Sequence, residues 1–270
     1  MKKLVVLLLG VLFLLNGCTK EKAEEAAIKT YIQAVNNISN MESANFTLDM
    51  QFNAEINQEP QNFAIHLNGA YNKDTSNIQL NSSIDIEQKE TDMDNLFSVY
   101  IKDNTLYLNF MNIQKFKTEL TPYKNLINDL NLSKEKIFNT QNMIDENIID
   151  EIKPFLKEVQ KDHDKITFTL DPSKVREYLK EQAKEKNTSK SDTLNQVNFD
   201  TITLSTTIKD DFIQDSQIHM IVKDPENEKD FIDVTISFTF TNINKVKNIS
   251  FPKDLDTYEE LDVNDLNNLL

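Results

Sequence analysis

The chain of 270 residues carries 44 acidic and 29 basic side chains, a formal net charge of −15, so long-range repulsion disfavours nucleic acid and anionic lipid headgroups as partners. Its three glycines are Gly10, Gly17 and Gly69. Walker loops, dinucleotide fingerprints and nucleophile elbows need glycines at fixed spacings that do not occur here, which argues against nucleotide-dependent catalysis.

The chain begins with a short leader. Basic residues at positions 2 and 3 precede the apolar run Leu4–Leu15, which is shorter than the roughly 20 residues that a membrane-spanning helix needs. The run ends in Leu15-Asn16-Gly17-Cys18, which resembles the bacterial lipobox, although Asn16 departs from the small residue usual there. We therefore expect residues 1–17 to be a lipoprotein signal peptide and Cys18 to carry a diacylglyceryl anchor. The alternative is a plain secretory signal with an incidental cysteine.

An acylated Cys18 implies a location on the outer face of the cytoplasmic membrane, on the cell surface of a Gram-positive bacterium. It is the only cysteine, so an internal disulfide is excluded and the fold must be held by its core. We expect a lipidated tether over residues 18–22, one domain over residues 23–255 and an acidic C-terminal tail over residues 256–270.

The first half of this domain reads as one helix followed by strands. Apolar residues recur at helical spacing between Lys20 and Asn40, behind an acidic start. From Asn45 the period changes to two, as in strands with one buried face. The pattern predicts a meander of five strands joined by polar turns of Asn and Asp. These strands are expected at 45–56, 63–71, 78–86, around 99–101 and at 106–110.

The second half returns to helices and then to strands. Apolar spacing between Pro122 and Lys161 predicts helices, with a kink or break at Pro154. A strand at 166–170 leads into a helix for which Asp171 is the expected N-cap and Pro172 the first residue. Further strands are expected at 197–208, 212–222 and 231–242, before a terminal segment at 246–251. This order predicts an α+β fold in which helices pack on the apolar face of one large antiparallel sheet.

Several short stretches carry a resemblance to a known family. Besides the leading helix and the meander, these are the hairpin Val99–Leu108, the helix start Leu170–Val175 and the closing Asn248–Pro252. Together they resemble the LolA-like (LprG/LppX-like) bacterial lipoprotein superfamily. The resemblance implies a large curved sheet, a half-barrel, with helices packed on its concave apolar face, and a lipid, glycolipid or lipoprotein held between them without catalysis or a cofactor.

An acyl chain is bound by buried methylenes and needs no special polar motif. The residues expected to line such a cavity are therefore inward-facing strand residues, which could equally fill an ordinary core. If the core is solid, the chain would instead be a scaffolding or protein-interaction lipoprotein of the cell envelope. The expected lining residues are Phe46, Met50, Phe52, Phe63, Ile65 and Leu67.

Candidate catalytic and metal-binding residues are few. His66 and His219 stand at polar positions of strands and are expected to be exposed, and His163 lies in a charged turn. The segment Asp92–Asn95 lacks the glycine and the distant glutamate of an EF-hand loop. We expect no enzymatic activity, no catalytic residues, no metal and no cofactor, and a monomer anchored to the membrane through Cys18.

Overall fold

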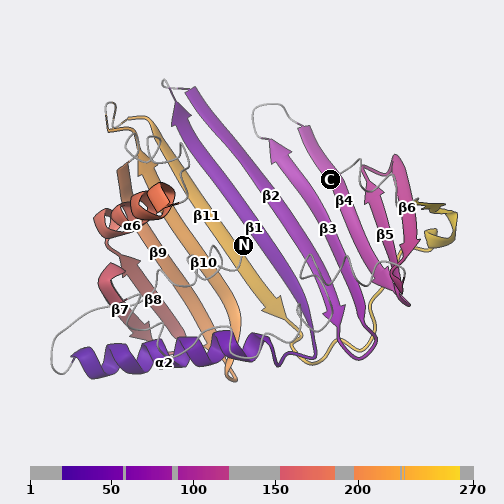
Figure 1. The fold of residues 1–270 in the computed structure, drawn as a ribbon, viewed down its shortest axis with the longest axis horizontal. Coiled ribbons are helices and arrows are strands. Elements are labelled where there is room, and N and C mark those ends of the chain that lie inside the picture. The colour runs from indigo at the N-terminus through magenta and orange to yellow at the C-terminus, as the bar shows by residue number, and fades with distance from the viewer. Residues whose placement is uncertain are drawn as a thin grey trace. The chain divides into compact units, whose positions relative to one another are not determined.

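The computed structural model describes residues 20–56, 59–86, 91–121, 153–185, 198–225, 227 and 229–261. They form two α-helices, two short 3₁₀ helices and twelve strands (Figure 1). The helices are α2 (Lys20–Ile38), α6 (Pro172–Glu185), η3 (Lys153–Phe155) and η4 (Leu255–Thr257). The strands are β1 (Ser43–Ile56), β2 (Glu59–Asn72), β3 (Asn77–Ile86), β4 (Thr91–Lys102), β5 (Thr105–Phe110), β6 (Gln114–Glu119), β7 (Leu156–Asp162), β8 (Lys165–Leu170), β9 (Asn198–Lys209), β10 (Phe212–Lys223), β11 (Phe231–Thr241) and β12 (Glu259–Glu260).

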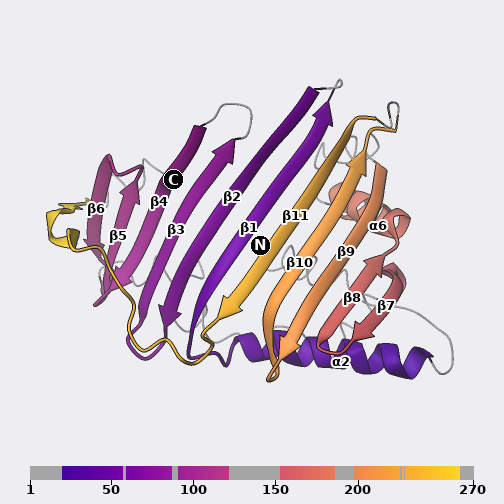
Figure 2. The ribbon, with the colours of Figure 1, turned by 180° about the vertical axis from the view of Figure 1, so that it is seen from behind.

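All twelve strands join one sheet in the order β12-β6-β5-β4-β3-β2-β1-β11-β10-β9-β8-β7. Neighbouring strands from β6 to β7 in this order run antiparallel, as Figures 1 and 2 show from the two faces, and β12 adds to the edge of β6 as a parallel strand. The predicted α+β fold class with one large antiparallel sheet is confirmed. The five strands predicted for the meander correspond to β1 to β5.

The chain divides into two compact units. Unit 1 comprises residues 1–38, 50–63 and 142–238, and unit 2 comprises residues 39–49, 64–141 and 239–270. The boundaries fall within strands β1, β2 and β11, so each of these strands contributes to both units.

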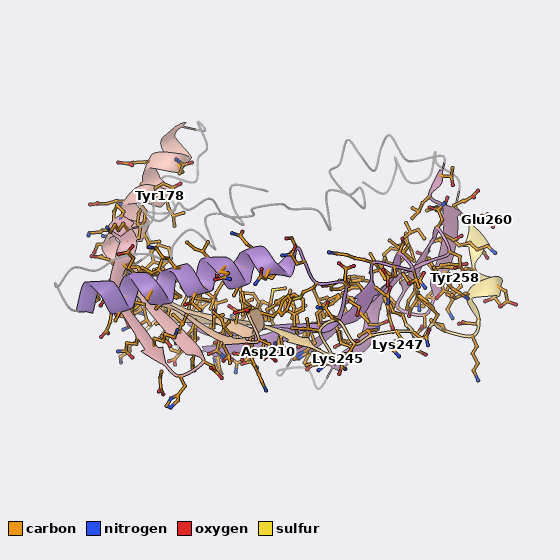
Figure 3. All side chains as sticks on the ribbon, turned by 90° about the horizontal axis from the view of Figure 1, so that it is seen from below. Tyr178, Asp210, Lys245, Lys247, Tyr258 and Glu260 are labelled. Carbon is orange, nitrogen blue, oxygen red and sulfur yellow. The ribbon has the colours of Figure 1, made fainter. Side chains whose placement is uncertain are left out.

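The core of unit 1 lies between helix α2 and strands β7 to β10. Helix α2 buries four of the apolar residues whose spacing predicted it, Ile28, Tyr31, Ile32 and Val35, and partly buries the fifth, Ile38. Tyr31 meets Phe168 of β8 edge-on at 5.3 Å between ring centroids. Burial raises the pKa of the Tyr31 hydroxyl. Figure 3 shows α2 lying along one face of these strands. The buried cluster comprises Ala27, Ile28, Tyr31, Ile32, Ala34, Val35, Leu156, Val159, Ile166, Phe168, Leu170, Val175, Ile202, Leu204, Ile208 and Ile213.

The second helix of unit 1, α6, begins where the sequence predicts. The Asp171 carboxylate accepts hydrogen bonds from the amides of Ser173 and Lys174 at 3.0 and 3.3 Å, and Pro172 is the first helical residue. The helix packs against β9 and η3, where Tyr178 meets Phe155 edge-on. Capping therefore fixes the point at which the chain leaves β8.

Unit 2 has a smaller buried cluster that includes the C-terminal segment. Tyr258 and Leu255 pack against Tyr100 of β4, and Tyr258 meets Tyr107 of β5 edge-on at 5.5 Å. The cation of Lys115 bonds to the Asp254 carboxylate at 2.7 Å. Figure 3 shows Tyr258 and Glu260 side by side in this segment. Residues 256–261, the beginning of the expected acidic tail, thus include the end of η4 and all of β12.

Strand β7 corrects one prediction. Residues 156–161 belong to the stretch expected to be helical, yet they form a strand paired with β8. A bulge between Leu156 and Glu158 shifts the register, so that Leu156 and Val159 are both buried although they stand three residues apart. Residues three apart also share the buried face of a helix, which is why this pattern predicted a helix instead of a strand.

Other differences concern shorter elements. Strand β6 was not predicted, and residues 246–251, expected as a terminal segment after the strands, form no strand or helix. The leader, Cys18 and the helices expected within residues 122–152 lie outside the described residues.

Asn and Asp residues make the hairpin turns, as predicted from the shortage of glycine. Asp103 and Asn104 between β4 and β5, and Asp210 and Asp211 between β9 and β10, all have positive φ values between 49° and 64°. Both two-residue loops fit the primed turns that match strand twist. Asn72 likewise accepts a hydrogen bond from the amide of Thr75 after β2.

Gly69 of β2 is the only glycine after the leader, and the packing of unit 2 explains it. A Cβ atom at this position would collide with the carbonyl oxygen of Gln79 on β3 and would lie 2.5 Å from the ring of Phe46 on β1. The backbone contact cannot yield without moving a neighbouring strand. The ring of Phe46 therefore occupies the space that a side chain would need.

We expect Gly69→Ala to lower the free energy of unfolding by roughly 1–3 kcal/mol, because the added methyl group forces strands apart. Urea denaturation followed by circular dichroism measures this. Gln61→Ala, at an exposed position of the same strand, is the control and should stay within about 0.5 kcal/mol of the unsubstituted chain. Equal stability of Gly69→Ala and the control would contradict the close approach.

Candidate functional site

An accessible aromatic pair lies on strands β1 and β2 in unit 1. The rings of Phe52 and Phe63 stack with centroids 4.4 Å apart and an interplanar angle of 13°. Phe63 nevertheless remains 42% exposed, and Phe52 is half-buried. Phe52 alternates with polar Gln51 and Asn53, so strand periodicity alone places it on the apolar face of β1. The pair is a rigid apolar surface that water can reach.

Two further large apolar side chains are exposed at the same end of neighbouring strands in unit 1. Ile56 ends β1 and is 38% exposed, and Ile232 stands at the start of β11 and is 41% exposed. Figures 1 and 2 show that β1 ends where β11 begins, because the two strands run in opposite directions. We call Phe52, Ile56 and Phe63 with Ile232 the apolar strand-end surface.

The remaining residues expected to line a cavity are also accessible. Met50 belongs to unit 1 and is half-buried on the same face of β1 as Phe52. In unit 2, Ile65 and Leu67 are half-buried on β2, and Phe46 lies against Gly69. None of the six expected residues is among the fully buried side chains that form the core clusters of the described residues. Whether they line a cavity stays a prediction.

The polar face of unit 2 carries a histidine held between two carboxylates. His66 of β2 bonds through Nδ1 to Asp49 of β1 at 2.6 Å and through Nε2 to Asp85 of β3 at 3.0 Å. The side chain of His66 is 31% exposed, so the expectation of an exposed histidine is corrected to a half-buried one. The hydrogen bond to Asp49 raises the pKa of His66, and the second carboxylate acts in the same direction. The three side chains tie three strands together.

The other two histidines also pair with carboxylates. His219 of β10 bonds to Asp233 of β11 at 3.0 Å and is half-buried rather than exposed as predicted. His163 bonds to Asp162 in the turn between β7 and β8, where its side chain is 93% exposed. Each of the three histidines thus bonds to at least one carboxylate of the protein itself.

A polar pocket of about 270 Å³ lies in unit 2, where three loops meet. Asn72 donates a hydrogen bond to the carbonyl of Val246, Asn244 accepts one from the amide of Glu42, and the amide of Val246 donates to the Ser43 hydroxyl. These bonds satisfy backbone groups that strands leave at their ends. The polar side chains here hold the loops in place. The pocket is lined by Glu42, Ser43, Asn72, Asp74, Thr75, Asn244, Lys245, Val246 and Lys247, and Figure 3 labels the two lysines.

The described part of the chain contains neither a metal-binding cluster nor a membrane-spanning helix. Among those residues, no group of three or more histidine, cysteine or carboxylate side chains has the geometry to hold a metal ion. Neither described helix is long and apolar enough to cross a membrane.

A model of a protein family of unknown function, DUF6612, matches residues 25–258. The chain belongs to this family. The matched range covers both units, from the first helix to the end of η4. No curated protein matches the chain.

Solved structures similar to this family member have low sequence identity. They include the YwiB protein of Bacillus subtilis, at 9% identity, 75% coverage of this chain, 97% of that one and a TM-score of 0.19. A DUF1329 family protein of Desulfovibrio piger has 11% identity, coverage of 83% and 95% and a TM-score of 0.23. A LolA superfamily protein of Nitrosomonas europaea has 10% identity, coverage of 84% and 98% and a TM-score of 0.23. Scores this low carry no argument about function.

Sequence reasoning missed several exposed apolar residues. Ile56 and Ile232 stand at strand ends, where the alternation of apolar and polar residues no longer indicates which side chains are covered. Phe110, Met111 and Ile113 lie in or beside the turn between β5 and β6. A signal for the last three was present, because apolar residues flank Asn112 in a turn that would ordinarily be polar.

We expect the three-strand contact of His66 to make stability depend on pH. The folded pKa lies above the ordinary value of 6.5, so the contact stabilises the fold fully below about pH 6.5 and loses its effect as pH rises through the raised pKa. With side chains 31%, 41% and 49% exposed, the loss should not exceed about 1 kcal/mol.

Urea denaturation between pH 5 and pH 8 gives the free energy of unfolding of the unsubstituted chain and of His66→Gln. We expect the difference between the two values to shrink as pH rises. Asp49→Asn should remove more of the pH dependence than Asp85→Asn, because Asp49 makes the shorter bond and the larger contribution to the pKa. A difference that is constant with pH would contradict the assignment.

Proposed function

We propose that this chain is a membrane-anchored extracytoplasmic lipoprotein that binds lipid, glycolipid or another lipoprotein without catalysing a reaction. The observation that carries the proposal is the apolar strand-end surface. A stacked aromatic pair whose outer ring, Phe63, is 42% exposed is poorly placed for a role in folding alone. It is well placed to contact an acyl chain.

The physical basis is burial of apolar area. Covering accessible side chains such as Met50, Phe52 and Phe63 with methylene groups gains about 25 cal/mol for each Å² removed from water. Aromatic rings that are already stacked lose little conformational freedom on binding, so little of this gain is offset. The contact selects a class of apolar ligand without needing a polar motif, which agrees with the absence of such a motif in the sequence.

The proposed location rests on the leader. The basic start, the apolar run Leu4–Leu15 and the Leu15–Cys18 lipobox support export followed by acylation of Cys18. A diacylglyceryl group supplies two chains, and two are enough for stable anchoring at about 0.8 kcal/mol for each buried methylene. The proposal places the chain with the LolA-like lipoproteins, to which its sequence bears the resemblance described above.

Mass spectrometry of lipid extracted from the purified chain, residues 20–270, tests the binding. We expect lipid at a defined ratio with the unsubstituted chain, and a loss of tenfold or more in Phe63→Asp, because a carboxylate within apolar contacts must be desolvated. The matched control is Gln51→Asp, which adds the same charge at an exposed position of opposite parity on β1.

Circular dichroism must show that the variants are folded. Lipid-free unsubstituted chain, even after incubation with envelope lipids, would overturn the proposal in favour of a scaffolding lipoprotein. Unchanged lipid content in a folded Phe63→Asp chain would place the binding surface elsewhere.

Acylation is tested separately in a Gram-positive host. We expect the full chain to incorporate labelled palmitate and to partition into the membrane fraction, and Cys18→Ala to do neither, because it removes the only thiol. Equal labelling of Cys18→Ala would show that the lipobox is not used.

A further inference from the structure

The turn between β5 and β6 in unit 2 ends in an apolar tip. Phe110 is 39% exposed, Met111 49% and Ile113 79%, the last being the most exposed large apolar side chain among the described residues. The three stand within four positions, interrupted by Asn112. The tip is therefore a small, dense group of accessible apolar side chains.

The backbone of this turn is held in an unfavourable conformation. Met111 and Asn112 have φ values of 54° and 58°. Asn tolerates this left-handed region, but a bulky residue such as Met is disfavoured there. The other described residues with positive φ are Asn and Asp, apart from the polar residues Ser76 and His163. A methionine at this position thus costs stability and gains no burial. Strain of this kind is typical of functional sites.

The tip is also rigid. The Asn109 side chain donates to Asn112 Oδ1 at 2.8 Å and accepts from the Asn112 amide at 3.1 Å. The amide of Met111 bonds to the carbonyl of Leu96, and that of Ile113 bonds to the carbonyl of Phe110. With the amides of Met111, Asn112 and Ile113 all engaged, the tip can leave water at a lower cost in unpaired donors.

We propose that this hairpin tip inserts into the surface of a lipid bilayer. An exposed hairpin turn needs no complementary groove when the partner is a bilayer, which deforms around it. A protein partner would need a matching pocket. The cations nearest to the tip in sequence, Lys115 and Lys117 of β6, are engaged with Asp254 and Glu260. Apolar transfer, rather than attraction to anionic headgroups, therefore drives the insertion.

The inference goes beyond lipid binding by β1 and β2, and it assigns a second contact with the membrane besides the anchor. A protein that loads or releases a lipid must meet the bilayer with a defined surface. An apolar tip on a stiff hairpin provides such a contact without a charged patch. The chain has a net charge of −15, so anionic lipids repel it at long range. An inserted apolar tip is affected little by this repulsion, because the contact does not depend on charge.

The test uses the absence of tryptophan from the chain. Gln114→Trp places one reporter at an exposed position beside the tip, and Glu119→Trp places the control at an exposed position at the other end of β6. The full chain is reconstituted in phosphatidylcholine vesicles, with and without acyl-brominated lipid. Either an acylated Cys18 or an uncleaved leader holds every variant on the vesicle, so the outcome is independent of both proposals made above.

We expect the Gln114→Trp emission to shift to shorter wavelength and to be quenched at least about twofold more than that of Glu119→Trp, since inserted groups reach roughly 5–10 Å into the interface. Adding Met111→Ser and Ile113→Ser to the Gln114→Trp chain should reduce quenching to the control level. This comparison removes any affinity of the reporter itself. Circular dichroism checks that each chain is folded.

Quenching of Gln114→Trp no stronger than that of Glu119→Trp would overturn the inference. So would strong quenching that persists without Met111 and Ile113, because the membrane contact would then lie outside the tip.

Discussion

The packing of helix α2 across strands β7 to β10 is the interaction on which unit 1 depends. An antiparallel sheet with one apolar face is stable only when that face is covered. Tyr31 and Val35 of α2 are buried against this part of the sheet, and Phe168 receives the edge of the Tyr31 ring. The helix thus supplies the apolar layer that a lone sheet lacks.

The same constraint explains why strands β1 and β2 are of interest. Their apolar positions follow the same period of two, yet Met50, Phe52 and Phe63 are half-buried or exposed in the described structure. Burying a fully exposed side chain of this size stabilises a fold by about 1.5–3 kcal/mol, and completing the burial of these side chains would add part of that amount for each. Leaving these side chains accessible forgoes that stabilisation. A binding surface is the physical reason that accounts for it best, because binding recovers the same free energy from a ligand.

Much of the fold could be predicted because its strands obey simple alternation and its turns use residues with known preferences. Helix α2, strands β1 to β5 and the Asp171 cap of α6 follow from spacing and capping alone. Strand β7 could not be predicted, because its bulge gives buried residues the spacing of a helix. Strand β6 has apolar Phe116 alone among polar neighbours, so its pairing with β5 comes from the hairpin and not from its own pattern.

The candidate sites were less predictable for a different reason. A period of two assigns a residue to a face of a sheet, but whether that face is covered depends on elements far away in the chain. Phe46 and Phe52 share one face of β1 by parity, yet one packs against Gly69 and the other stacks on an exposed ring. The polar partners of His66 come from the two strands on either side of β2, and their convergence depends on register, which spacing within a single strand does not contain.

The scarcity of glycine ties these features together. With Gly69 alone after the leader, left-handed turn positions must be filled by other residues, and Asn and Asp fill most of them. Against that background Met111 is an exception with a cost, because Asn would adopt the same φ with less strain and without exposing a thioether to water. The turns after Lys102 and Lys209 use Asn and Asp, and the remaining exceptions, Ser76 and His163, are polar. A methionine in this conformation between β5 and β6 therefore points to a requirement at the tip that folding does not impose.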